Sequence, residues 1–391
     1  MNRTKRLLSV MLLTCGMATG AWALDTDTDG YYLIGSVQDW QDFAALVETT
    51  PTANARMTAD INLGDDQTVI ATTYSGTFDG QKHTLTFNLT ATKSGYGLFC
   101  TLGDATIKNL HVTGTVTTSY DYTGGIVGCI QEYKTGTLTN CRSSVTMHAS
   151  SSAEDTGGFV GQVDYHSTFS INDCLFDGSF DGAQSSDWGG FIGHNYYAYV
   201  TISNSLFAPT SINIKDGLST FGSNPTNCFT SVSGNTTQGV LVTAEQLSDG
   251  TTAAALQNNR EETVWVQDPL TNQPMLALFA GKYTVPTSGV GTFSAKANFT
   301  LPDGLTAYYC KNYDATDGTI SVTAIEGTVP AETGVLLKGT AGETYTLTIS
   351  DETPATVTDI ERGAGNPSMK TVARILEVLG LEMQFRIRQT T

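Results

Sequence analysis

The sequence predicts an all-β protein: a right-handed parallel β-helix, then a small β-sandwich-like module and a short helix-plus-strand tail. Similar segments recur about every 32 residues. Their short β-branched and aromatic runs are separated by Gly, Asp and Ser and show no helical period, so each copy predicts three short strands. The clearest copies are GGIVGCIQEYKTGTLTNCRSSVTM (124–147), GGFVGQVDYHSTFSINDCLFDGSF (157–180) and GGFIGHNYYAYVTISNSLFAPTSI (189–212).

Residues 1–23 have the pattern of a secretory signal peptide. Basic residues precede the apolar run 7–13, and Ala21-Trp22-Ala23 is a small-x-small cleavage site. Cleavage near Ala23 predicts a protein that is secreted or held at the outer cell surface, with residues 24–30 as an acidic leader. Lipid attachment at Cys15 is the alternative. No later apolar run reaches the ~18 residues that a transmembrane helix needs.

The charge of the chain argues against nucleic acid as a partner. Residues 1–23 carry three basic and no acidic residues, so their removal changes the net charge from −18 to −21. A body this acidic repels phosphate backbones. The six remaining cysteines show no paired C-x-x-C spacing, and we expect neither a metal nor a cofactor.

Residues 31–282 form the predicted β-helix. Stacked coils bury their apolar faces against one another, and their backbones pair at about 4.8 Å. Glycines then permit close contact between coils, and asparagines at a bend bond to one another up the stack. The expected columns are Ile126, Phe159 and Phe191; Leu138, Ile171 and Ile202; Gly125, Gly158 and Gly190; and Asn109, Asn140, Asn172 and Asn204.

Two further expectations concern the ends of the β-helix and its cysteines. Because a β-helix has open edges at both ends, we expect helix-containing caps within 39–47 and 243–256. Cys141 and Cys174 occupy equivalent positions, so either a disulfide joins them or both are small buried residues. The main rival fold is a β-propeller, whose blades need longer repeats.

Several further motifs stand out between residues 31 and 268. They are GTFDGQKHTLTFNL (76–89), GYGLF (95–99), ATIKNLHVTGTV (105–116), the GGxxG units, and the flanking YYLIGSVQDWQDFAALV (31–47) and VTAEQLSDGTTAAALQNNREETVWVQD (242–268). Together they resemble the GLUG-type repeats of secreted bacterial proteins, which also precede the catalytic part of IgA-specific metallopeptidases. The resemblance covers about residues 31–280 and implies an extracellular repeat domain, not an activity.

The 32-residue period stops at residue 283. Strand-like runs separated by Pro-Asp-Gly and Gly turns predict a small β-sandwich-like module over 283–358, which ends early. It resembles the β modules that follow such repeats in secreted proteins of the Bacteroides group.

Residues 359–391 form a predicted helix-turn-helix-like remnant. A helix is expected after the N-cap Ser368, and the apolar alternation over 381–387 predicts a strand. The segment 354–387 resembles the C-terminal half of Xre-type helix-turn-helix antitoxins and repressors, which implies DNA-facing positions at Thr356 and Thr358. The first two helices of that family are absent, so we interpret the tail as a fused remnant.

We expect no catalytic residues and no metal site. The five histidines form neither H-E-x-x-H nor a close pair, and His194 is expected in a turn. Asp121, Asp155 and Asp187 recur before the glycine pairs as turn residues, with a carboxylate cluster or a cation site as the alternatives. DTDTDG (25–30) begins like a calcium loop but has Ser36 in place of the bidentate Glu.

The candidate ligand-binding residues are aromatic. Tyr133, Tyr165 and Tyr197 are spaced 32 residues apart, which predicts a ladder along one edge with His166, Tyr196 and Tyr199 nearby. Exposed rings offer flat apolar faces with polar rims, which suit sugars or protein loops. The alternative is that the rings only pack together and stiffen the turns.

The sequence therefore predicts an exported, monomeric, non-catalytic repeat protein that mediates adhesion by binding a glycan or a host or bacterial surface protein. A polysaccharide-active β-helix enzyme is one alternative. A DNA-binding regulator that acts through the C-terminal tail is the other.

Overall fold

The computed structural model describes residues 24–350 except 151–152, 183–187, 215–217, 235–236, 269, 287, 296–297 and 315–318. The predicted signal peptide and the predicted helix-turn-helix-like tail lie outside the described residues.

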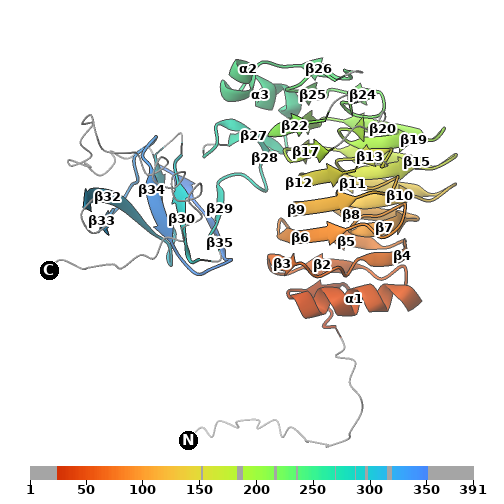
Figure 1. The fold of residues 1–391 in the computed structure, drawn as a ribbon, viewed down its shortest axis with the longest axis horizontal. Helices are drawn as coiled ribbons and strands as arrows, with labels where there is room; N and C mark the ends of the chain where they lie inside the picture. Colours follow the sequence, from red (N-terminus) through yellow and green to blue (C-terminus); the bar gives the residue numbers. More distant parts are fainter. Residues whose placement is uncertain are drawn as a thin grey trace, which may run out of the picture.

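Most of the described chain is a stack of coils, whose strands form three parallel sheets along the sides of the stack (Figure 1). The first sheet contains β1 (Tyr32–Ile34), β2 (Ala55–Met57), β5 (Thr77–Asp79), β8 (Ala105–Lys108), β11 (Thr135–Thr139), β15 (Thr168–Asn172), β20 (Tyr199–Ser203) and β24 (Pro225–Thr226). The second sheet contains β4 (Ile70–Tyr74), β7 (Phe99–Leu102), β10 (Val127–Ile130), β14 (Val160–Val163) and β19 (Ile192–Asn195).

The third sheet runs along the remaining side of the stack. Its strands are β3 (Ile61–Gly64), β6 (Thr84–Thr90), β9 (His111–Thr118), β12 (Arg142–Ala149), β16 (Leu175–Phe176), β21 (Leu206–Phe207), β25 (Phe229–Thr230) and β26 (Val240–Leu241), with β17 (Ser179–Gly182) and β22 (Ser211–Asn213) beside them. A short fourth sheet consists of β13 (Thr156–Gly157), β18 (Trp188–Gly189) and β23 (Leu218–Ser219).

Coil-to-coil pairing confirms the predicted parallel β-helix. Leu138 pairs with Ile171 and Ile171 with Ile202, all in parallel strands. This continuous pairing differs from the separate four-stranded blades of the rival β-propeller. Inside the coils, the ring of Phe191 lies 4.8 Å from that of Phe159 and 4.8 Å from that of Phe221. The apolar columns therefore form one continuous core.

The glycine pairs let neighbouring coils touch. Gly125, Gly158 and Gly190 lie in one column, because Val127 pairs with Val160 and Val160 with Ile192. A Cβ atom on Gly125 would lie 2.3 Å from the Gly158 carbonyl oxygen, and one on Gly158 would lie 2.2 Å from that of Gly190. A side chain at either position would force the coils apart.

The last glycine of each GGxxG unit has a separate role. A Cβ atom on Gly161 would lie 2.1 Å from the carbonyl carbon of Tyr122, and one on Gly193 would lie 2.2 Å from the carbonyl oxygen of Asp155. These glycines therefore allow the preceding turns to lie against the second sheet.

The bend between the first and third sheets is the predicted asparagine column, with one correction. Thr139 pairs with Asn172, so Asp173 and not Asn172 matches Asn140. Asn172 still takes part, because its side-chain oxygen accepts hydrogen bonds from Ser203 (2.6 Å) and Asn204 (3.4 Å). The residues of this bend all have φ between 49° and 54°, and we call them the asparagine corner: Asn109, Asn140, Asp173, Asn204 and Asn227.

The position after the asparagine corner is buried, and in three coils a cysteine occupies it. The thiols of Cys141, Cys174 and Cys228 each lie 3.3–3.4 Å from the carbonyl oxygen two residues earlier, as the hydroxyl of Ser205 does at 2.8 Å. Cys141 and Cys174 are free thiols. The structure therefore shows the buried-residue alternative and no disulfide between them.

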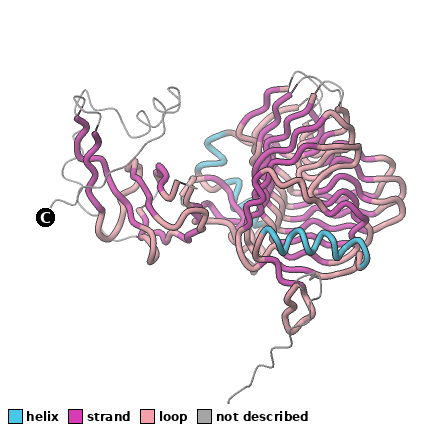
Figure 2. The backbone as a smooth tube through the Cα atoms, turned by 60° about the horizontal axis from the view of Figure 1, so that its bottom comes forward, coloured by secondary structure: helices cyan, strands magenta, loops and turns pink. Residues whose placement is uncertain are grey.

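A helix covers the N-terminal end of the stack. Helix α1 (Val37–Thr49) begins at the N-cap Ser36, whose hydroxyl accepts the backbone N–H of Asp39. Its buried Trp40 meets the rings of Phe78 and Phe99 at 5.9 and 6.0 Å. Figure 2 shows this helix lying across the end of the coils. The predicted N-terminal helix therefore closes the aromatic core.

The predicted C-terminal helices begin a segment that returns along the third sheet. Helices α2 (Ala244–Ser248) and α3 (Thr251–Gln257) are followed by the antiparallel pair β27 (Trp265–Asp268) and β28 (Gln273–Leu276). Together they pack against the outer face of that sheet, where Leu175 and Leu206 belong to the same apolar cluster as Leu256, Trp265 and Phe279. This lateral packing was not anticipated.

A separate antiparallel module follows. Its strands are β29 (Lys282–Thr284) with β35 (Thr344–Thr346); β30 (Val290–Phe293), β34 (Val335–Lys338), β32 (Thr306–Asp314) and β33 (Thr319–Ala324); and β31 (Phe299–Thr300) with β36 (Thr348–Ile349). It contacts the first coils through the Lys282 ammonium, which donates to the Lys82 carbonyl oxygen (2.8 Å), and through the Thr344 hydroxyl, which donates to Asp60.

Candidate binding surface

The candidate ligand-binding residues lie at the corner between the second and first sheets. Five of them belong to three successive turns, 131–134, 164–167 and 196–198, which connect β10 to β11, β14 to β15 and β19 to β20, and Tyr199 is the first residue of β20. The third turn is one residue shorter than the other two. We call the six residues of this surface the aromatic strip: Tyr133, Tyr165, His166, Tyr196, Tyr197 and Tyr199.

The register of the turns differs from the predicted ladder. Val163 aligns with Ile130 and Thr168 with Thr135, an offset of 33 residues, so His166 and not Tyr165 occupies the position of Tyr133. The matching residues Tyr133, His166 and Tyr197 have φ values of 59°, 53° and 53°. Tyr165 precedes this position and lies between two of the matching rings.

The six rings form one connected surface. Tyr165 contacts Tyr133 and Tyr197, with ring centroids 6.3 Å apart in both cases. The imidazole of His166 stacks on Tyr133 at 5.6 Å and on Tyr199 at 6.4 Å. Tyr196 joins the strip through Tyr197 at 5.2 Å. The structure therefore brings all six candidate residues together.

Much of the strip faces solvent. Tyr133 is 67% exposed, Tyr197 75% and Tyr199 67%, whereas Tyr165 is half-buried between its neighbours. Desolvation and the neighbouring Glu132 carboxylate raise the pKa of the Tyr133 phenol, which keeps its proton at neutral pH. The strip thus presents apolar ring faces together with hydroxyl groups that can donate and accept hydrogen bonds.

Of the three aspartates before the glycine pairs, the two that the structure describes have separate partners. The Asp121 carboxylate accepts the backbone N–H of Glu154 (2.9 Å). Asp155 lies one position out of register with Asp121, since Gly124 pairs with Gly157, and contacts the His194 imidazole at 3.1 Å. Asp187 lies outside the described residues. Among the described residues, no group of three or more His, Cys, Asp or Glu side chains could hold a metal ion.

His194 was expected in a turn, and that expectation is wrong. It lies on β19, next to the aromatic strip, with its side chain on the outer face of the second sheet. Its partner Asp155 is 39 residues away in the sequence, so no short motif reveals the pair. Asp155 precedes its glycine pair by two residues, whereas His194 follows its own by four, so no shared spacing marks the pair either.

The acidic start of the described chain does not have the arrangement of a calcium loop. Asp27 accepts the backbone N–H groups of Asp29 and Tyr31, and its carboxylate lies 2.6 Å from the Arg56 guanidinium. Arg56 also lies over the Tyr31 ring at 4.1 Å. These contacts tie residues 27–31 to β2.

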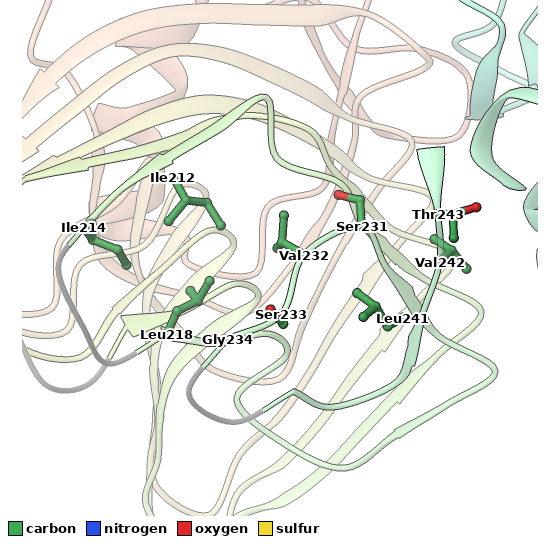
Figure 3. Close-up of a pocket in the computed structure, with 10 residues that line it drawn as sticks. All are labelled: Ile212, Ile214, Leu218, Ser231, Val232, Ser233, Gly234, Leu241, Val242 and Thr243. Carbon is green, nitrogen blue, oxygen red and sulfur yellow. The ribbon is translucent and has the colours of Figure 1, made fainter. Parts of the chain in front are cut away.

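An open apolar depression of about 680 Å³ lies at the C-terminal end of the stack (Figure 3). No charged group lines it among the described residues, and Leu241 on the edge strand β26 is 54% exposed. It marks the place where a further coil would stack. Its lining residues are Ile212, Ile214, Leu218, Ser231, Val232, Ser233, Gly234, Leu241, Val242 and Thr243.

Comparison with known proteins gives two matches. A helix-turn-helix family model matches residues 349–385. The described fold is similar to the crystal structure of "a putative immunoglobulin A1 protease" from Bacteroides ovatus, with a TM-score of 0.48 and 18% identity, over 65% of this chain and 94% of that chain. No curated protein matches the chain. The resemblance to GLUG-type repeats remains a prediction.

No helix in the described part of the chain combines the length and apolarity required to cross a bilayer.

Proposed function

We propose that this chain is an exported, non-catalytic surface protein that binds a glycan along the aromatic strip. The supporting observation is the conformation of the strip. At three successive corners an aromatic residue (Tyr133, His166 or Tyr197) adopts a positive φ, and the two tyrosines do so at a higher cost than glycine or asparagine would. Residues held in costly backbone conformations are concentrated at functional sites. Here the costly conformation directs the tyrosine rings into solvent.

The arrangement suits an extended sugar chain better than a compact ligand. Coils of a β-helix repeat about every 4.8 Å, so the strip offers ring faces at several successive levels along the stack. Sugar rings present apolar faces that pack on aromatic rings, and their hydroxyls can bond to the phenols. A glycan that lies along the stack would contact Tyr133, Tyr165 and Tyr197 together.

Export is part of the same proposal. It depends on the signal-like residues 1–23, which lie outside the described structure. Cell fractionation of the source bacterium with an antibody against the chain tests it. We expect the protein in the medium or on intact cells, where external protease can digest it; confinement to the cytoplasm would exclude a surface role.

Glycan binding is tested on an array with the mature chain and with Tyr133→Asn/Tyr165→Ala/Tyr197→Asn. Asparagine is chosen at positions 133 and 197 because it tolerates positive φ, so the triple variant keeps its backbone. Tyr120→Ala, which removes a 40% exposed tyrosine outside the strip, is the matched control. We expect the triple variant to lose binding and the control to keep it; equal binding by all three proteins would refute the proposal.

The helix-turn-helix match favours DNA binding through residues 349–385 as a second candidate function. Recognition helices enter the major groove only when the rest of the motif supports them. A gel-shift assay with the full chain and a library of duplexes, compared with a chain that ends at residue 350, tests this function. A shift that needs the last 41 residues would support it, and the absence of any shift would exclude it.

A further inference from the structure

The aromatic surface continues beyond the six predicted residues onto the second sheet. The ring of His194 lies 6.0 Å from that of Tyr196, which belongs to the strip, and 6.2 Å from that of Tyr122. Tyr122 is in the turn that Gly161 allows to lie against the sheet. The connected rings therefore turn the corner from the strip to a second group, which we call the His194 subsite: His194, Asp155 and Tyr122.

The orientation of His194 is fixed by a buried carboxylate. Its Nδ1 atom lies 3.1 Å from Oδ1 of Asp155, and Asp155 is only 7% exposed. A carboxylate accepts and cannot donate, so Nδ1 carries a proton, and in the neutral imidazole Nε2 then has its lone pair available. The imidazole side chain is 38% exposed, and Nε2 has no hydrogen-bond partner among the described residues.

The groups around this imidazole complement a hydroxyl. Burial raises the pKa of the Tyr122 phenol, and the carboxylates of Asp155, Asp121 and Glu154 raise it further, so the phenol remains a donor. Nε2 of His194 is an acceptor. A sugar hydroxyl both donates and accepts, so it can pair with the two groups together.

The charge around the subsite disfavours anionic ligands. The charged residues that act on Tyr122 are all acidic: Asp155, Asp121 and Glu154. Lys134, which follows Tyr133 of the strip in the same turn, is paired with Asp104 at 3.0 Å. Sugars with carboxylate or sulfate groups would approach several like charges, which costs free energy.

From this geometry we infer that the His194 subsite binds a hydroxyl group of an uncharged sugar at the end of the aromatic strip, and so selects neutral over acidic glycans. The inference rests on the proposed glycan binding by the strip. Nε2 of His194 accepts a hydrogen bond from the sugar hydroxyl, and the Tyr122 phenol donates one to it. Asp155 is a positioning residue that sets the tautomer of the imidazole.

The experiment measures affinity for three soluble probes by titration calorimetry: a neutral glucan hexasaccharide, a neutral mannan hexasaccharide and a polyuronate hexasaccharide. The mature chain is compared with His194→Ala, His194→Gln and Tyr122→Phe. His148→Ala is the matched control, because His148 also faces an aspartate (Asp181, 3.3 Å) but lies on the third sheet, away from the strip.

We expect the mature chain to bind a neutral probe and to ignore the polyuronate. Loss of one hydrogen bond predicts binding about threefold to tenfold weaker for His194→Ala and for Tyr122→Phe. His194→Gln regains part of that affinity, because its amide oxygen can accept in place of Nε2. His148→Ala binds as the mature chain does.

The outcomes separate the two proposals. If the mature chain binds none of the probes and no glycan on the array, glycan binding by the strip fails. If the triple tyrosine variant loses binding while His194→Ala and Tyr122→Phe keep full affinity, glycan binding by the strip is supported and the His194 subsite is refuted. Preference of the mature chain for the polyuronate would also refute the subsite.

Discussion

Two corners of the same coil have the same backbone conformation but carry different kinds of side chain. The asparagine corner places Asn109, Asn140 and Asn204 at φ values near 50°, and their amides bond to one another or to neighbouring coils. The opposite corner places Tyr133 and Tyr197 at similar φ values, with their rings in solvent. The tyrosines of the second corner lack the side-chain amide that suits asparagine to this conformation.

The largest effect is expected where the asparagine corner is interrupted. Asp173 accepts hydrogen bonds from Arg260 (2.9 Å) and from the indole of Trp265 (3.0 Å), and so fastens the returning segment to the third sheet. Asp173→Ala leaves the buried Trp265 indole N–H and Nη1 of Arg260 without this acceptor, and we expect a loss of about 3 kcal/mol in the free energy of unfolding. Urea denaturation followed by tryptophan fluorescence measures it.

Asp173→Asn is the control for that change, because it restores the residue type of the neighbouring coils and still accepts from Trp265. We expect it to lose less than half as much as Asp173→Ala. Equal losses would show that the Arg260 charge alone holds the segment.

A smaller effect is expected within the regular part of the asparagine corner. The Asn140 amide donates to the Asn109 side-chain oxygen (3.3 Å), and its backbone has φ 52°. Asn140→Ala removes the hydrogen bond and places a less tolerant residue at positive φ, so we expect a loss of about 2 kcal/mol. Asn140→Gly is the matched variant. Because glycine tolerates positive φ, it should lose only the free energy of the hydrogen bond, and a loss as large as that of Asn140→Ala would show that the backbone conformation contributes nothing.

Asp79, which accepts a hydrogen bond from the Asn109 amide of the asparagine corner, predicts a pH dependence. Burial raises the pKa of Asp79, but hydrogen bonds from Asn109 and Gln81 and the charge of Lys108 outweigh it, so the pKa is below its ordinary 3.8. A lowered folded-state pKa stabilises the fold above about pH 3.8, and this stabilisation is lost as the pH falls through the folded pKa.

Asp79→Asn should therefore unfold with less dependence on pH between about pH 4 and pH 2 than the unchanged chain. Circular dichroism during acid titration measures the transition. Asp173 in the asparagine corner provides the contrast, because burial raises its pKa despite the nearby Arg260 charge. Protonation of Asp173 should therefore stabilise the fold as the pH falls toward 3.8. Identical acid transitions for the Asp79 variant and the unchanged chain would refute the assignment.

The smallest effect on stability is expected at the aromatic corner. Tyr133→Asn loses ring contacts with Tyr165 and His166 but relieves the positive φ, and each term is about 1 kcal/mol. We expect the free energy of unfolding to stay within about 1 kcal/mol of the unchanged chain. A loss above about 2 kcal/mol would mean that the rings serve packing, as the alternative interpretation of the strip holds.

The sequence was sufficient for the features that depend on a regular period. The paired glycines, the phenylalanine column and the helices near both ends follow from spacing and residue type alone, because each coil repeats the same contacts. The alignment of corner residues between successive coils could not be derived from the sequence. Tyr165 and His166 are adjacent, as are Asn172 and Asp173, and a turn that varies by one residue decides which of them takes the corner position.

Contacts between distant segments could not be predicted at all. Arg260 and Asp173 are 87 residues apart, and His194 and Asp155 are 39 apart. Neither pair repeats in the other coils, so no period marks it. Such pairs depend on how the chain returns to an existing surface, which only the folded arrangement shows.

The in-register glycine column has a consequence for how this protein can change in length. Since each coil docks on the next through identical backbone contacts, duplication of residues 124–156 would insert one more level without altering either end. The stack would grow by about 4.8 Å and gain one further tyrosine in the aromatic strip. The length of the strip could thus evolve by copy number alone, with no new side chain required.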